Sequence, residues 1–169
     1  TDLQTAKITT KAITLNWKGA SGTSYEVRRS EASGRNWITL AKNIQRTTYT
    51  DKTCKAGTHY QYKIVAAQAA NVTALIKTAA KPARPQLRSV KKKGRRIHIV
   101  WKKCKADKME VYVKAGKGKF KKAITVKGNK VSYQLKAKKG KRYTIKLRAI
   151  VKLEGNKKLC STYSKAKKA

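Results

Sequence analysis

Residues Gly57–Ala66 read Gly-Thr-His-Tyr-Gln-Tyr-Lys-Ile-Val-Ala, and Gly140–Ala149 read Gly-Lys-Arg-Tyr-Thr-Ile-Lys-Leu-Arg-Ala. In both stretches a glycine opens a run in which apolar or aromatic side chains alternate with polar ones, the period-two pattern of a β-strand with one buried face. A strand or hairpin alone is at best marginally stable in water. Each stretch therefore predicts a surrounding set of strands, and the chain is predicted to contain two small β domains.

The rest of the sequence repeats around these two stretches. Trp101 follows Trp17 by 84 residues and Tyr143 follows Tyr60 by 83. The only two prolines, Pro82 and Pro85, lie together between the repeats, where strands must stop. We therefore predict a first domain over residues 1–80, a short and fairly stiff linker over residues 81–85, and a second, strongly basic domain over residues 86–169.

Three features together resemble tandem fibronectin type III domains. They are an inward Trp at the end of an early strand (Trp17, Trp101), a following strand of Tyr-Glu-Val type (Tyr25–Val27, Met109–Val111), and the two glycine-led stretches. The lysine-rich close of the chain, Glu154–Lys165, resembles the lysine-rich modules of Gram-positive bacterial surface and secreted proteins. The resemblance implies an all-β chain of two immunoglobulin-like, seven-stranded sandwiches, with both Trp residues in the cores.

The resemblance also implies roles for tyrosines and cysteines. Tyr60 and Tyr143 occupy the position of the tyrosine corner, whose hydroxyl binds the backbone of the preceding turn. Cys54 lies at a core position, where it acts as a small buried hydrophobe. Cys104 and Cys160 lie next to loops that this fold places at one end of the domain, so a disulfide between them is our hypothesis.

The charge is the feature that points beyond the fold. The chain has 44 Lys and Arg against seven Asp and Glu, a formal net charge of +37. After residue 81 there are 31 of the basic residues and only three of the acidic ones. An imbalance of this size indicates an anionic partner. The residues that we expect to contact a polyanion are in the second domain: Lys91, Lys92, Lys93, Arg95, Arg96, Tyr112, Lys119, Lys121 and Lys122.

Two interpretations of this charge stay open. The second domain has 25 Lys and six Arg, and lysine is a hydrated point charge without the planar fork of arginine. We expect these side chains at turns and on outward strand faces, as a halo that attracts anionic polymers with low specificity. The alternative is a dedicated site for nucleic acid, glycosaminoglycan or teichoic acid. Tyr112, beside Lys114, is then the candidate for a stacking contact.

Little in the sequence points to catalysis. The recurrent acids, Glu26 and Glu110, fall on outward positions and are predicted to be solvated surface groups. His59 and His98 belong to different domains and have no second ligand at metal-binding spacing. There is no phosphate-binding glycine loop and no nucleophile elbow. We expect no enzyme activity, no cofactor and no metal.

The leading hypothesis is a non-catalytic spacer and adhesion module of a bacterial cell-surface, cell-wall or secreted protein that binds extracellular anionic polymers weakly. The chain has no leader and does not start with Met, so we expect part of a longer chain, which further domains could join. No apolar run is long enough for a membrane span. A module that binds other proteins through its edge strands is a further alternative.

Overall fold

The computed structural model describes residues 2–20, 22–31, 34–67 and 72–169, without the side chains of Val72 and Thr73. The chain forms two compact units, residues 1–81 with 153–157 and residues 82–152 with 158–169. None of the described segments is a helix that could span a membrane. The described strands of the first unit are β1 (Gln4–Ile8), β2 (Ile13–Asn16), β3 (Tyr25–Glu31), β4 (Ile38–Ile44), β5 (Thr48–Asp51), β6 (His59–Ala66) and β7 (Val72–Ala79). Those of the second unit are β8 (Leu87–Lys93), β9 (Arg96–Trp101), β10 (Lys108–Ala115), β11 (Lys121–Lys127), β12 (Ser132–Lys136), β13 (Tyr143–Lys152), β14 (Lys158–Cys160) and β15 (Lys167–Lys168).

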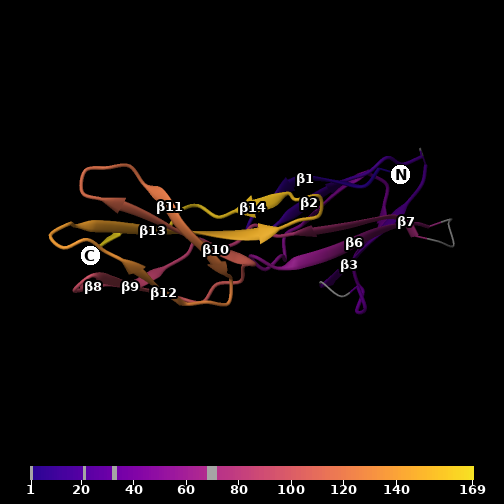
Figure 1. Ribbon diagram of the computed structural model, residues 1–169. Coiled ribbons are helices and arrows are strands. Elements are labelled where there is room, and N and C mark those ends of the chain that lie inside the picture. The colour runs from indigo at the N-terminus through magenta and orange to yellow at the C-terminus, as the bar shows by residue number, and fades with distance from the viewer. Residues whose placement is uncertain (1, 21, 32–33, 68–71) are drawn as a thin grey trace. The chain divides into compact units, whose positions relative to one another are not determined.

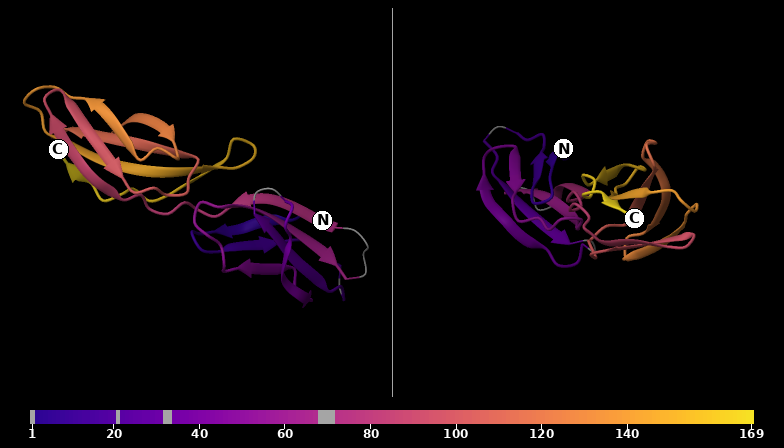
Figure 2. Two further views of the ribbon diagram at one scale, coloured as in Figure 1. Left: turned by 90° about the horizontal axis from the view of Figure 1, so that it is seen from below. Right: turned by 90° about the vertical axis from the view of Figure 1, so that its left-hand side faces the viewer.

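Each unit consists of a three-stranded and a larger antiparallel sheet (Figure 1). The first unit has the orders β1-β2-β5 and β4-β3-β6-β7, and the second has β12-β9-β8 and β11-β10-β13-β14, with β15 also paired to β13. Figure 2 shows these sheets from two further sides. The predicted all-β class with two sandwiches is confirmed. The last strand of the second sandwich is divided into β14 and β15, which raises its number of strands by one.

The cores lie between the sheets because one face of each strand is apolar. Along β6 the residues Tyr60, Tyr62 and Ile64 are buried, and their counterparts along β13 are Tyr143, Ile145 and Leu147. Trp17 and Trp101 are 5% and 2% exposed. The buried residues that pack around them in the first unit are Ile13, Leu15, Tyr25, Val27, Cys54, Tyr60, Tyr62, Ile64 and Ala80. Those in the second are Ile97, Ile99, Met109, Val111, Ala137, Tyr143, Ile145, Leu147 and Ala149.

The tyrosine that opens each of β6 and β13 ties down the turn before it. Tyr60 Oη accepts a hydrogen bond from Lys55 N at 2.8 Å, and Tyr143 Oη accepts one from Lys138 N at 2.9 Å. Both rings are buried against their cores. This is the hydrogen bond that defines a tyrosine corner. It satisfies a backbone donor that the turn itself leaves unpaired.

Replacing Tyr143 by Phe should lower the free energy of unfolding of the second unit by about 1–2 kcal/mol, because Lys138 N–H loses its acceptor while the ring stays packed. Tyr133→Phe is a matched control, since the half-buried Tyr133 packs against the same core. Thermal unfolding of both variants measures the difference. A Tyr143→Phe protein that melts like the wild type would contradict a structural role for this hydroxyl.

A buried polar network distinguishes the core of the first unit. Asp51 is 1% exposed, and its Oδ2 accepts hydrogen bonds from Arg29 Nη1 at 2.6 Å and Tyr62 Oη at 2.7 Å. Its Oδ1 accepts bonds from Thr53 N at 2.8 Å and Thr53 Oγ1 at 2.7 Å. The Cys54 thiol lies 3.4 Å from Asp51 Oδ2. Every acceptor direction of the carboxylate is thus occupied.

The second unit holds apolar residues at the corresponding places. Strand pairing aligns Asp51 with Leu135, because they face Ile13 and Ile97. It aligns the pair Arg29 and Tyr62 with Val113 and Ile145. Cys54 corresponds to Ala137, since each lies three residues before a turn glycine. The same fold therefore accepts either an ionic or an apolar filling at this position.

Two serines modify the last strand of the second unit. Ser161 N donates to Ala149 O at 2.9 Å, and Ala149 N donates in return to Ser161 Oγ, also at 2.9 Å. Ser164 and Leu147 exchange the same two kinds of hydrogen bond. In a regular antiparallel pair, the N–H groups of Ala149 and Leu147 would donate to backbone carbonyls of the neighbouring strand and not to serine hydroxyls. The ladder of β14 therefore stops at Cys160, although the chain continues alongside β13.

Candidate polyanion-binding surface

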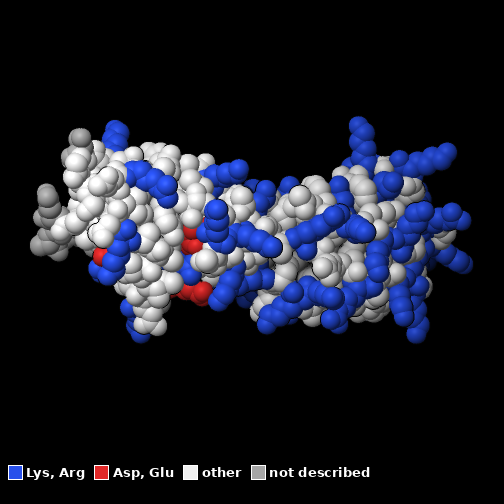
Figure 3. All heavy atoms as spheres, turned by 180° about the vertical axis from the view of Figure 1, so that it is seen from behind, with Lys and Arg blue, Asp and Glu red and all other residues white. Residues whose placement is uncertain are grey.

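The two units have similar cores but very different surfaces. Residues 82–169 carry 31 Lys and Arg and three carboxylates, so most of the cations have no acidic partner. Figure 3 shows basic side chains over the second unit, crowded at its right-hand end, and fewer over the first. Because the fold is the same in both units, this charge is not a requirement of the fold. It is the property for which a separate explanation is needed.

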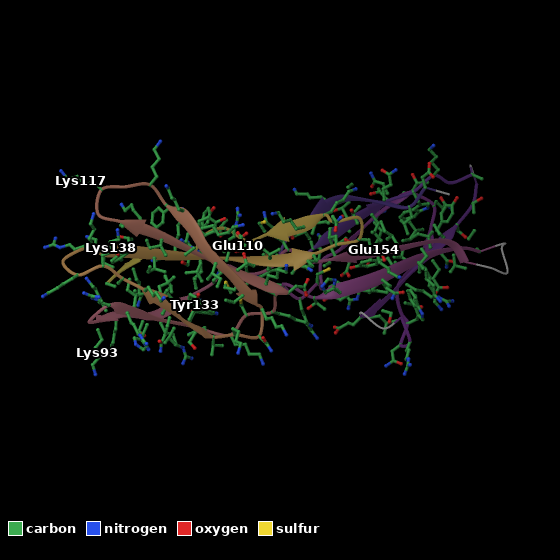
Figure 4. All side chains as sticks on the ribbon, viewed as in Figure 1. Lys93, Glu110, Lys117, Tyr133, Lys138 and Glu154 are labelled. Carbon is green, nitrogen blue, oxygen red and sulfur yellow. The ribbon has the colours of Figure 1, made fainter. Side chains whose placement is uncertain are left out.

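Three turns bring basic residues to one end of the second unit. They connect β8 to β9, β10 to β11 and β12 to β13, and Figure 4 shows Lys93, Lys117 and Lys138, one from each turn, at this end. Backbone hydrogen bonds join the turns, since Gly116 N donates to Arg142 O at 2.9 Å and Ala137 N donates to Arg95 O at 2.7 Å. We call this end the basic pole, which comprises Lys91, Lys92, Lys93, Arg95, Arg96, Lys117, Lys119, Lys136, Lys138, Lys139, Lys141 and Arg142.

One lysine of the basic pole has an internal role. Lys92 Nζ donates to Lys138 O at 3.1 Å and to Lys141 O at 2.8 Å, and it lies 5.7 Å from the centroid of the Tyr143 ring. Ala137 N donates to Arg95 O at 2.7 Å beside it. Lys92 therefore connects two turns and is less available to a ligand than its neighbours. Among the other expected contacts, Lys91, Lys93, Arg95, Arg96, Lys119 and Lys121 are exposed.

Tyr112, the candidate for a stacking contact, is engaged by its neighbours in the sheet. Tyr112 is half-buried, its ring contacts the ring of Tyr163 edge-on at 5.0 Å, and its hydroxyl donates to Glu110 Oε2 at 2.9 Å. Burial, the contact with Tyr163 and the bond to Glu110 raise the pKa of Tyr112. Lys122 is also engaged, because its Nζ lies 3.4 Å from Glu110 Oε1. Both side chains therefore have partners within the sheet, and their contact with a polyanion stays a prediction.

The prediction that Glu110 is a solvated surface acid is also wrong. Glu110 is 2% exposed, and its Oε2 accepts a hydrogen bond from Arg148 Nε at 2.9 Å, with Arg148 Nη2 at 2.7 Å. Burial opposes its ionisation, but hydrogen bonds from Arg148 and Tyr112 outweigh burial and lower the pKa of Glu110. Glu26, at the same place in the first unit, is more exposed. Bonds from Arg28 and Thr39 lower its pKa to about 2.

Cations and rings alternate across the outer face of β10, β13 and the last strand. Lys146 Nζ lies 3.7 Å from the centroid of Tyr163 and 4.3 Å from that of Phe120. Arg148 Cζ lies 5.2 Å from Tyr163 and 5.4 Å from Tyr112. Such contacts contribute about 0.5–2 kcal/mol each. The sequence signal for this cluster is the alternation of Lys146 and Arg148 along a strand, but the participation of Tyr163, which lies between β14 and β15, is seen only in the structure.

The hypothesis of a disulfide between Cys104 and Cys160 is wrong. All three cysteines are free thiols, and Cys54 is buried. Cys104 packs against the second core. Cys160 pairs with Ile150, which points to the same side of β13 as Arg148 and hence to the outer face. The two thiols therefore lie on opposite faces of the sheet. Burial raises the pKa of Cys54 to about 11, which makes it a poor nucleophile.

The described residues contain no group of three or more His, Cys, Asp or Glu that could hold a metal ion. A surface groove of about 370 Å³ in the second unit has no carboxylate, imidazole or thiol in its lining, and so offers no acid–base pair. Its lining residues are Arg84, Pro85, Gln86, Leu87, Lys165 and Lys167. The feature that points to a function is therefore the excess of unpaired Lys and Arg in the second unit.

Comparison with known proteins supports the architecture. No family model matches the sequence, and no curated protein matches it. A two-domain fibronectin type III segment of chicken tenascin aligns with 99% of this chain and 95% of its own, with a TM-score of 0.60 and 19% identity. The FN1–FN3 domains of chicken CNTN1 align with 99% of this chain and 65% of their own, with a TM-score of 0.46 and 18% identity. The match to the tenascin segment shows that the chain has the fold of two fibronectin type III domains in tandem.

Proposed function

We propose that this chain is a non-catalytic spacer and adhesion module of a bacterial surface or secreted protein, and that its second unit binds anionic polymers. The observation that carries the proposal is the charge difference between two copies of one fold. Residues 1–81 have 13 Lys and Arg against four acids, whereas residues 82–169 have 31 against three. A surface with this excess attracts polyanions and releases their counterions on binding.

The placement of the acids strengthens this proposal. Asp107 lies before β10, at the end of the second unit away from the turns of the basic pole, and Glu154 belongs to residues 153–157, which group with the first unit. Glu110 is buried and paired with Arg148. The basic pole itself contains no carboxylate. A polyanion that approaches this end therefore meets no Asp or Glu side chain among the residues of the basic pole.

The test is binding of the intact chain to heparin over a series of NaCl concentrations. We expect the affinity to fall steeply with salt, and the triple variant Lys93→Gln, Lys117→Gln and Lys138→Gln to bind more weakly, with a salt slope reduced by about two to three. The matched control removes three exposed lysines from the first unit: Lys7→Gln, Lys42→Gln and Lys52→Gln. Equal losses in both variants, or no binding by the wild type, would contradict the proposal.

A further inference from the structure

Strand pairing builds a regular array of cations on the outer face of the β12-β9-β8 sheet. Arg96 lies in the middle strand, opposite Lys93 on one side and Lys136 on the other. The next outward residue, His98, lies between Lys91 and Gln134. All six of these side chains are exposed. Neighbouring positions in such an array are about 4.8 Å apart across strands and about 6.7 Å apart along a strand. We call this surface the cationic face.

The four cations of the cationic face have no acidic neighbour on it. None of the residues of β8, β9 and β12 is Asp or Glu, and all three strands lie within the described chain. The ion pairs found among the described residues involve none of Lys91, Lys93, Arg96 and Lys136. Four like charges on one small surface repel each other, which lowers stability unless a ligand neutralises them.

The first unit has fewer cations on the corresponding face. There Thr14 and Thr50 occupy the places of His98 and Gln134, and their hydroxyl oxygens are 3.0 Å apart. Beside them, Thr48 Oγ1 donates to Asn16 Oδ1 at 2.9 Å. Lys7 lies opposite Thr14, at the place of Lys91, so the corresponding face of the first unit has a cation beside these neutral pairs. The cationic face of the second unit departs from this arrangement without a gain in internal hydrogen bonds.

The chemistry of the cationic face defines a class of ligand. It has no Phe, Tyr or Trp side chain, the rings on which single-strand binding surfaces mainly stack bases, and its planar groups are those of His98 and Arg96. Three of its four cations are lysines, which bind phosphate as point charges. A phosphodiester polymer has its charges in the chain itself, whereas a polycarboxylate peptide has them on side chains that must be ordered at an entropic cost. The array therefore suits an extended phosphodiester chain whose phosphates, and not its bases, are bound.

We infer that the cationic face is a binding site for a linear phosphodiester polymer, recognised by its backbone charge alone. The inference rests on the proposed binding of polyanions and adds a location and a ligand class to it. The test uses the intact chain and an abasic phosphodiester oligonucleotide of about 12 units, long enough to cross the three strands. The face variant is Lys91→Gln, Arg96→Gln and Lys136→Gln. The control removes three exposed lysines from the opposite end of the same unit: Lys127→Gln, Lys130→Gln and Lys152→Gln.

We expect the face variant to lose at least about tenfold in affinity and about two in salt slope, since each lost phosphate contact on a single strand lowers the slope by about 0.7. The control should stay within about threefold of the wild type. Oligothymidylate of the same length should bind like the abasic strand, and polyglutamate of equal charge should bind more weakly. Unfolding midpoints of both variants verify that the fold is intact.

Each other outcome overturns the inference in a distinct way. Equal losses in the face variant and the control would show a diffuse halo, and the proposed polyanion binding would survive. Tighter binding of oligothymidylate than of the abasic strand would show that bases are read. Polyglutamate that binds as tightly as the abasic strand would remove the preference for phosphodiesters. Absence of binding to both the abasic strand and heparin would overturn the proposed function itself.

Discussion

Replacing Asp51 by Ala is expected to lower the free energy of unfolding of the first unit by about 3–5 kcal/mol. Asp51 is the shared acceptor for Arg29 and Tyr62, and the side chain of Arg29 is only 11% exposed. The substitution leaves the guanidinium partly buried without its counter-ion and the Tyr62 hydroxyl without its acceptor. Amide hydrogen exchange measures the effect, with protection of β6 reporting the first unit and protection of β13 serving as the internal reference.

The second unit supplies the control for this prediction. A variant with Arg29→Val, Asp51→Leu, Cys54→Ala and Tyr62→Ile installs the apolar residues that the second core has at these places. Because a well-packed apolar filling can replace a buried ion pair without loss, this variant should be within about 2 kcal/mol of the wild type. If it is as unstable as Asp51→Ala, the loss comes from packing and not from an unpaired charge.

The same network predicts an acid dependence. Burial opposes ionisation of Asp51, but hydrogen bonds from Thr53, Tyr62 and Arg29 outweigh it and lower its pKa in the folded state. An unfolded Asp has a pKa of about 3.9, so the stabilisation is complete above this pH and is lost as the pH falls from there towards the folded value. Urea unfolding of the first unit between about pH 5 and pH 2 should show this loss, and the apolar variant should lack it.

Replacing Glu110 by Gln is expected to destabilise the second unit by about 2–4 kcal/mol. The carboxylate is buried and accepts hydrogen bonds from Arg148 and Tyr112, and it is the counter-ion of Lys122. The amide is of equal size but neutral, so Arg148 keeps its charge in a partly buried place without compensation. Protection of β13 amides, with β6 as reference, measures the loss. Tyr112 and Tyr163 should also change environment, which tyrosine fluorescence detects.

Glu26→Gln in the first unit is the matched control for this variant. Glu26 occupies the same place in its sheet and pairs with Arg28, whose side chain is 39% exposed. Exposed ion pairs contribute little to stability, so the loss should be clearly smaller. Equal losses in the two variants would mean that the exposure of the ion pair does not set its contribution. Full stability of Glu110→Gln would mean that solvent compensates Arg148 in the second unit.

The strands and cores are predictable because alternation along a strand is a local property. Tyr60, Tyr62 and Ile64 are recognised as one face without knowledge of any partner strand. The environment of Asp51 is different, because Arg29 comes from another strand 22 residues away. Glu110 was expected in water for the same reason: it points outward from its strand, but Arg148 and Tyr112 cover it. The direction of a side chain is set by its own strand, whereas its exposure depends on the residues that pack around it.

The charge could be counted from the sequence but not located. The prediction of basic residues at both ends and on outward faces did not reveal the array formed by Lys93, Arg96 and Lys136, because this array depends on the register of two strand pairs. A shift of one residue in either pair would turn alternate side chains to the other face. The disulfide hypothesis failed in a similar way, since two neighbouring loops can present their side chains on opposite faces of a sheet.

The two serines after β14 affect how easily a second copy of this protein can add a strand to the sheet. The end strands of an open sheet offer backbone groups to which a second molecule can add a strand, and proteins avoid this where they meet at high concentration. Ser161 and Ser164 replace backbone carbonyls with hydroxyls as acceptors for β13, which breaks the regular ladder that such an addition requires. The lysines around them add repulsion between copies. We therefore expect this margin of the sheet to be a poor site for the addition of a strand from a second copy.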